Sequence, residues 1–150
     1  MTEAKKTMKL TNTSILILLI IGLVLLAGLM SVSSVELDIR GMIFVDDDAE
    51  SSWYDATHVR SIQEGIDNAS SGDTVFVYNG TYYENVIVNK TIELIGENSN
   101  STIIDGGSMN NVLNISANLV TINGFRLENG NYGVYFNNSN DSLIYNCNCS

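Results

Sequence analysis

The sequence contains no proline, one histidine and one tryptophan, and it is poor in basic residues. Seven Lys and Arg stand against seventeen Asp and Glu, which gives a net charge of −10. So few basic residues do not make a phosphate-binding surface, and we expect no nucleic-acid partner. A single histidine speaks against a copper site, which draws on several His, Cys or Met ligands. Without proline, the tight turns fall largely to the abundant Asn, which tolerates left-handed backbone.

The N-terminal segment has the pattern of a targeting signal. Lys5, Lys6 and Lys9 precede an uninterrupted apolar run over residues 15–30, and small residues follow it. The run is longer than the apolar core of a typical signal peptide and shorter than a typical spanning helix. Residues 1–33 are therefore a cleaved signal peptide or an uncleaved signal-anchor, which would contact the membrane through residues 15–30. In both cases we expect the rest of the chain to be extracellular or at the cell surface.

Asn-x-Ser/Thr acceptor sequences for N-glycosylation support a secretory route, because they matter only there. A chain rich in Asn, Ser and Thr also produces such triplets by chance. The glycosylation candidates after the apolar run are Asn68, Asn79, Asn89, Asn100, Asn114, Asn137, Asn140 and Asn148.

Residues 34–73 are predicted to hold an entry strand, an acidic loop and a capping helix. The strand covers 42–45 and ends at three consecutive Asp residues. Ser61 and Glu64 have the spacing of a capping box, which marks the start of a helix. Ile62 and Ile66 lie on one apolar helical face. Gly72 is predicted to end the helix.

Residues 74–150 are predicted to be strands throughout, because apolar runs of three to five residues alternate with Asn, Gly and Ser. Residues near the C-terminus repeat at about 22 positions, a period typical of β-solenoids. The repeated pairs are Val112 with Val134, Ile122 with Ile144, Phe125 with Cys147, and Leu127 with Cys149. In a solenoid these pairs stack on successive coils.

Three segments (61–69, 72–75 and 79–86) resemble the entry region of right-handed parallel β-helix proteins of the pectin-lyase-like, NosD-type surface family, which is frequent in archaea. The resemblance extends from about residue 42 to 150. It implies an all-β fold: a right-handed, single-stranded parallel β-helix whose N-terminal end is covered by the helix. Gly65 departs from the pattern, since such helices usually carry Ala there. No distinct closing element follows the last repeat, so we expect the coils of 74–150 to be the first part of a longer β-helix.

The resemblance does not fix an activity, because this fold hosts lyases, hydrolases, epimerases and binding proteins. We interpret the chain as a non-catalytic scaffold or carbohydrate-contacting module, with cell-surface polysaccharide or another surface protein as partner. One alternative is the N-terminal part of a polysaccharide lyase or hydrolase. The other is a copper-handling protein, for which His58, Met42 and Met109 are the available ligands.

A calcium site at Asp46, Asp47, Asp48 and Asp55 is the only cofactor that the residues indicate, because Ca²⁺ takes several oxygen ligands. The spacing does not match an EF-hand loop. A solvated turn is the alternative, since three adjacent carboxylates at a strand end do not all point at one ion.

No catalytic residues are assigned. Asp105, Arg126 and Glu128 lie in the repeat, but glycoside hydrolysis needs two facing carboxylates and the sequence alone identifies no such pair. Cys147 and Cys149 alternate on one strand, so both point to the same side. Because they align with Phe125 and Leu127, we expect them to fill the interior. A redox or soft-metal role is the alternative.

Overall fold

The computed structural model describes residues 40–108 and 110–150, which form parallel β-sheets with one short helix. The predicted signal or anchor at 1–33, with its membrane contact at 15–30, lies outside the described residues, as does Met109. Within the described ranges, no helix has the length and apolarity needed to cross a membrane. A mostly β, parallel fold is as the sequence predicts.

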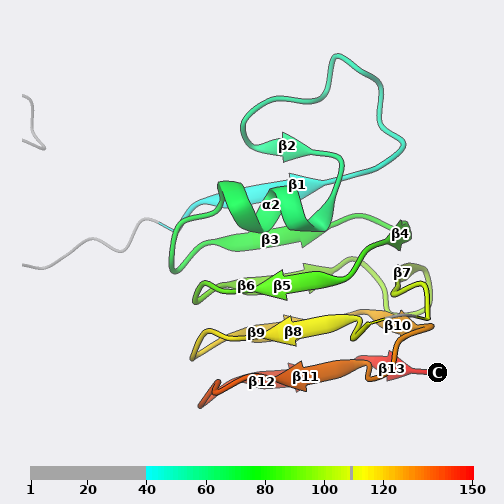
Figure 1. Ribbon diagram of the computed structural model, residues 1–150. Coiled ribbons are helices and arrows are strands. Elements are labelled where there is room, and N and C mark those ends of the chain that lie inside the picture. Colours follow the sequence, from blue (N-terminus) through cyan, green and yellow to red (C-terminus); the bar gives the residue numbers. More distant parts are fainter. Residues whose placement is uncertain (1–39, 109) are drawn as a thin grey trace, which may run out of the picture. The chain divides into compact units, whose positions relative to one another are not determined.

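The strands form three parallel sheets, here named A, B and C, and the chain visits the sheets in a fixed order (Figure 1). From β3 onward, consecutive strands belong to sheets A, B and C in turn, so every third strand pairs in parallel with its predecessor. Sheet A contains β1 (Met42–Val45), β2 (His58–Val59), β3 (Thr74–Val77), β6 (Glu93–Gly96), β9 (Thr121–Asn123) and β12 (Leu143–Tyr145). Sheet B contains β4 (Gly80–Tyr83), β7 (Thr102–Asp105), β10 (Arg126–Glu128) and β13 (Asn148–Cys149). Sheet C contains β5 (Val86–Val88), β8 (Leu113–Ile115) and β11 (Val134–Phe136). This arrangement is compatible with a β-solenoid.

The core lies between the sheets and consists of columns of apolar side chains, one residue from each strand. In sheet A the column runs through Val75, Leu94 and Ile122, all fully buried. Sheet B contributes Tyr82, Ile104 and Leu127 in the same way. Alternate residues point to opposite faces of a strand, so every such column has a solvent-facing column beside it.

The stacking register confirms part of the predicted repeat and corrects one pair. Ile122 pairs with Ile144 and Leu127 pairs with Cys149, as expected. Val134, however, pairs with Leu113, so the prediction that it stacks on Val112 is wrong by one residue. The repeat spacing is not constant along the chain, because the polar corners between strands differ in length while the short strands keep their partners.

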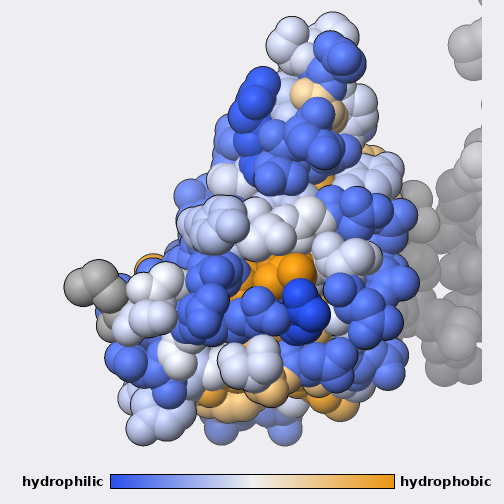
Figure 2. Space-filling model, turned by 90° about the vertical axis from the view of Figure 1, so that its right-hand side faces the viewer, coloured by the Kyte–Doolittle hydropathy of each residue, from blue (hydrophilic) through white to orange (hydrophobic). Residues whose placement is uncertain are grey.

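Sheet B presents a polar exterior. Figure 2 views the molecule from the side on which Figure 1 draws β4, β7, β10 and β13, and it shows a mostly hydrophilic face with a small apolar patch. The outward column through these strands is Thr81, Ile103, Arg126 and Asn148, of which three are polar.

Helix α2 (Ile62–Asn68) packs against β1, β2, β3 and β5. Its N-cap is Ser61, whose hydroxyl accepts from the Glu64 N–H at 3.2 Å, as predicted. Ile62 and Ile66 are fully buried. Gly65 faces Val45 and Val75 so closely that a Cβ there would lie 2.9 and 3.0 Å from their methyl groups. This close approach gives a physical reason for Gly at this position.

The two ends of α2 are capped by residues from elsewhere in the chain. The Glu84 carboxylate accepts from the N–H groups of Ile62 and Gln63, both at 2.9 Å. The Lys90 ammonium donates to the carbonyls of Ile66, Asp67 and Ala69. Because a helix end leaves several backbone groups unpaired, these contacts complete the helix. The prediction that Gly72 ends it is wrong: the C-cap is Ala69.

Candidate functional site

The acidic turn after β1 brings three of the four predicted calcium ligands together. Oxygen atoms of Asp46, Asp47 and Asp48 all lie within 4.8 Å of one another. Among the described residues, these form the one group of three or more His, Cys, Asp or Glu that is close enough to hold a metal ion. Burial is the largest cause of a raised pKa at Asp46, and the Asp48 side chain adds to it. The neighbouring carboxylates of Asp47 and Asp48 also repel that of Asp46, and a bound cation would relieve this repulsion. Calcium binding here stays a prediction.

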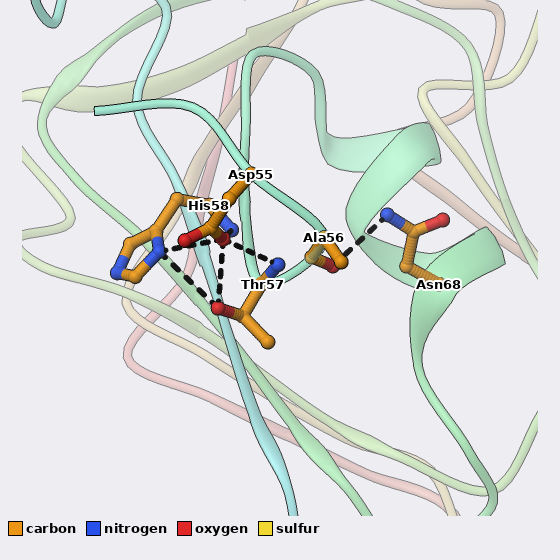
Figure 3. Close-up of polar contacts among 5 residues, drawn as sticks. All are labelled: Asp55, Ala56, Thr57, His58 and Asn68. Atoms are coloured by element: carbon orange, nitrogen blue, oxygen red, sulfur yellow. Dashed lines mark hydrogen bonds and ion pairs between the residues drawn. The ribbon is translucent and has the colours of Figure 1, made fainter. Parts of the chain in front are cut away.

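Asp55, the fourth predicted ligand, is not part of that group and holds the loop instead. Its Oδ1 accepts from the Thr57 N–H at 2.7 Å, the Thr57 hydroxyl at 2.9 Å and the His58 N–H at 2.9 Å. The same oxygen lies 2.9 Å from the His58 Nδ1 (Figure 3). These hydrogen bonds, the Thr57 N–H first, lower the pKa of Asp55 to about 2. The loop is also tied to α2, because the Asn68 amide donates to the Ala56 carbonyl at 3.2 Å.

His58 belongs to an aromatic cluster, which we define as Phe44, Trp53, Tyr54, His58, Phe76 and Tyr78. His58 lies on β2, where it pairs with Phe44 of β1. Its ring stacks on Phe44 at 5.2 Å between centroids and meets Trp53 edge-on at 4.6 Å. Arg60 lies 3.9 Å above the Tyr54 ring. These contacts account for His58 as a packing residue beside an acidic partner, and the copper role stays a hypothesis.

We predict that the loop clasp made by Asp55 weakens at low pH. Its folded pKa, about 2, lies below the ordinary 3.8. The ionised carboxylate therefore stabilises the folded loop above pH 3.8, and this contribution is lost as pH falls through about 2. Trp53 is the only tryptophan of the chain, so its fluorescence should change over this range while circular dichroism monitors the strands. Asp55→Asn should shift the emission already at neutral pH, whereas Asp67→Asn should not. Emission identical in all three proteins would contradict the prediction.

The structure also places together two carboxylates that the sequence left unconnected. Asp105 of β7 and Glu128 of β10 are register partners in sheet B. Both are already engaged: Asp105 accepts from the Gly107 N–H and the Asn129 amide, each at 2.9 Å. Glu128 Oε1 lies 2.8 Å from the Arg126 Nε. Both carboxylates are therefore held by contacts within sheet B or its following turn.

The glycosylation candidates differ in accessibility. Seven are exposed. Two of these already donate hydrogen bonds through their amides: Asn68 to the Ala56 carbonyl at 3.2 Å and Asn79 to the Glu97 carboxylate at 3.0 Å. Asn114 is half-buried on β8. Whether any of them carries a glycan stays a prediction.

Cys147 and Cys149 are both free thiols. Cys147 packs against the core, and burial raises its pKa, which disfavours the reactive thiolate. Cys149 pairs with the buried Leu127 but is itself exposed, because β13 is the last strand of sheet B. Cys147 thus lies where its predicted interior role requires, and the interior role of Cys149 stays a prediction.

Comparison with known proteins gives one informative similarity. The chain is 38% identical over 88 residues to a protein named cell surface glycoprotein from the archaeon Methanothermus fervidus. The similarity covers 57% of this chain but only 14% of that protein. No protein-family model and no solved structure matches the chain. The similarity suggests a location at the cell surface.

Proposed function

We propose that this chain is part of a cell-surface protein in which a right-handed, single-stranded parallel β-helix serves as a non-catalytic scaffold and contacts carbohydrate. The similarity to a cell surface glycoprotein carries the surface assignment. The regular rotation of strands through three parallel sheets supports the β-helix. The helix α2, capped by Glu84 and Lys90, covers apolar residues of β1 and β3, as the N-terminal cap of a solenoid would.

A scaffold role is favoured over catalysis by the state of the acidic residues. Asp105 and Glu128 are engaged by backbone, amide and guanidinium groups. Elimination at uronates also needs a base close to bound calcium, and the acidic turn has only Asp side chains within its group. A polysaccharide lyase or hydrolase remains the alternative, and it predicts release of unsaturated or reducing sugar ends from pectate.

The surface assignment can be tested directly. The full chain with a C-terminal epitope tag would be produced in an archaeal host, and intact cells would be treated with protease. We expect the tag to be removed from intact cells, while a cytoplasmic marker protein survives until lysis. A tag that is protected until lysis would overturn the proposal. Sugar release from pectate by the purified chain would instead favour the enzyme alternative.

A further inference from the structure

A pocket at the corner between sheets B and C is lined mainly by asparagine side chains. It has a volume of about 390 Å³, and its polar lining is Asn85, Asn110, Asn111, Asn114 and Asn131. Apolar surface comes from Val86 and Ile87 of β5, and none of the described residues that line the pocket is charged. The asparagines come from three successive passages of the chain, before β5, around β8 and before β11. Since neighbouring strands lie about 4.8 Å apart, the pocket extends roughly 10 Å along the stack.

The backbone around the pocket is held in place by hydrogen bonds between these passages. The Asn85 amide donates to the carbonyls of Gly106 at 2.9 Å and Asn111 at 3.1 Å. The Asn131 N–H donates to the Asn110 carbonyl at 2.9 Å. A ligand would therefore meet a preformed lining, which lowers the entropic cost of binding.

Asn114 differs from its neighbours because its buried Oδ1 has no hydrogen-bond partner within the described part of the chain. Buried polar atoms without a partner are uncommon in folded proteins. A side-chain amide has a carbonyl oxygen that accepts and an NH₂ group that donates two hydrogen bonds. Rotation about the Cβ–Cγ bond of Asn exchanges the positions of these two groups. Asn114 can therefore offer either to a ligand hydroxyl in the pocket.

Two exposed tyrosines lie next to residues that line the pocket: Tyr135 is paired with Asn114, and Tyr132 follows Asn131. Ile87, Asn114 and Tyr135 are register partners on the outward face of sheet C, whose strands Figure 1 shows stacked in the foreground. Tyr135 is 45% exposed, and its ring lies 6.3 Å from that of Tyr132, which is 63% exposed and follows Asn131. An exposed aromatic ring beside the Asn114 amide gives an apolar platform next to a hydrogen-bonding group.

We propose that this pocket and the Tyr132–Tyr135 pair bind a neutral oligosaccharide. Each sugar offers hydroxyls, which both donate and accept hydrogen bonds, and an apolar ring face. The asparagine amides of the site can bind the hydroxyls, and the tyrosine rings can pack against the ring face. The absence of charge in the lining selects against acidic sugars, because a uronate carboxylate would be desolvated there with no cation to pair it. This inference rests on the proposed function and adds a location and a ligand class to it.

The test uses the full chain produced without glycosylation and a panel of hexasaccharides of glucose, mannose, galactose and N-acetylglucosamine, with oligogalacturonate as the acidic comparator. We expect at least one neutral oligosaccharide to bind with a Kd of about 1 mM or tighter, and more tightly than the acidic one. Asn114→Leu should weaken binding about fivefold, the effect of one lost hydrogen bond. Tyr135→Ala should weaken it about tenfold.

Tyr145→Ala is the matched control, because Tyr145 is similarly exposed, at 42%, but lies on sheet A. It should bind like the unchanged chain, and all variants should unfold at the same temperature. The inference is overturned if no neutral oligosaccharide binds, or if Tyr145→Ala removes binding while Asn114→Leu and Tyr135→Ala do not. Neither result alters the outcome of the protease test on intact cells, so a failure here is separable from a failure of the surface assignment.

Discussion

Replacing Ile66 with Asp should destabilise the chain by about 4 kcal/mol, because the new carboxylate would be buried against apolar side chains without a partner. Ile66 is fully buried on α2, and the next helical residue on the same face, Ile62, is equally buried. A loss of this size is a large part of the stability of a typical domain, about 5–15 kcal/mol. Chemical denaturation of the full chain, followed by circular dichroism, measures it.

Ile87→Asp provides the control for that experiment, because it makes the same chemical change at an exposed position. Ile87 is 49% exposed on the outward face of β5. Its replacement should lower the free energy of unfolding by about 1 kcal/mol or less. If Ile66→Asp unfolded at the same denaturant concentration as the unchanged chain, α2 would not cover the core in solution, and its role as an end cap would be wrong.

For the helix α2, local sequence predicts the position and the N-cap but not the contacts that complete its ends. Its position and N-cap follow from the capping-box spacing and the apolar face, which are properties of about ten consecutive residues. Its remaining caps, Glu84 and Lys90, lie more than twenty residues from their partners Ile62 and Ile66. No local pattern marks them, since a Glu and a Lys in polar corners are ordinary surface residues until the strands stack.

For the strands, too, local sequence predicts the elements but not all of their contacts. Apolar runs bounded by Asn and Gly identify where strands lie, and Ile122 with Ile144 gives their partners correctly. The pairing of Val134 is missed by one residue because the corners between strands differ in length from one passage to the next. A one-residue difference matters, since it exchanges the inward and outward faces.

The candidate sites depend on register even more. Asp46, Asp47 and Asp48 are adjacent in sequence, so their proximity could be predicted. The asparagine-lined pocket could not, because its members become neighbours only when three passages align. The available signal was an Asn close to each of the corners before β5, β8 and β11, which becomes informative once the register of sheet C is known.

Replacing Gly96 with Ala should strongly destabilise the stack. Gly96 ends β6, and its counterpart on the next passage, Gly124, follows β9. A Cβ on Gly96 would press on the Gly124 carbonyl oxygen, and a Cβ on Gly124 would press on the Gly96 carbonyl oxygen. The Phe125 ring, fully buried, lies 3.1 Å from the same Gly96 position. The two glycines therefore allow successive corners to stack in contact.

We expect Gly96→Ala to lower the free energy of unfolding by about 3 kcal/mol, the upper end for overpacking, because the obstructing atoms are backbone and cannot rotate away. Gly107→Ala separates this steric effect from backbone strain. Gly107 has φ +65° but no atom within 4 Å of an added Cβ, so only the left-handed conformation opposes the change. That strain amounts to about 1–2 kcal/mol. Urea denaturation of both variants gives the comparison. Equal losses, or a smaller loss for Gly96→Ala, would mean that these corners are not in contact, and the parallel register of β6 with β9 would need revision.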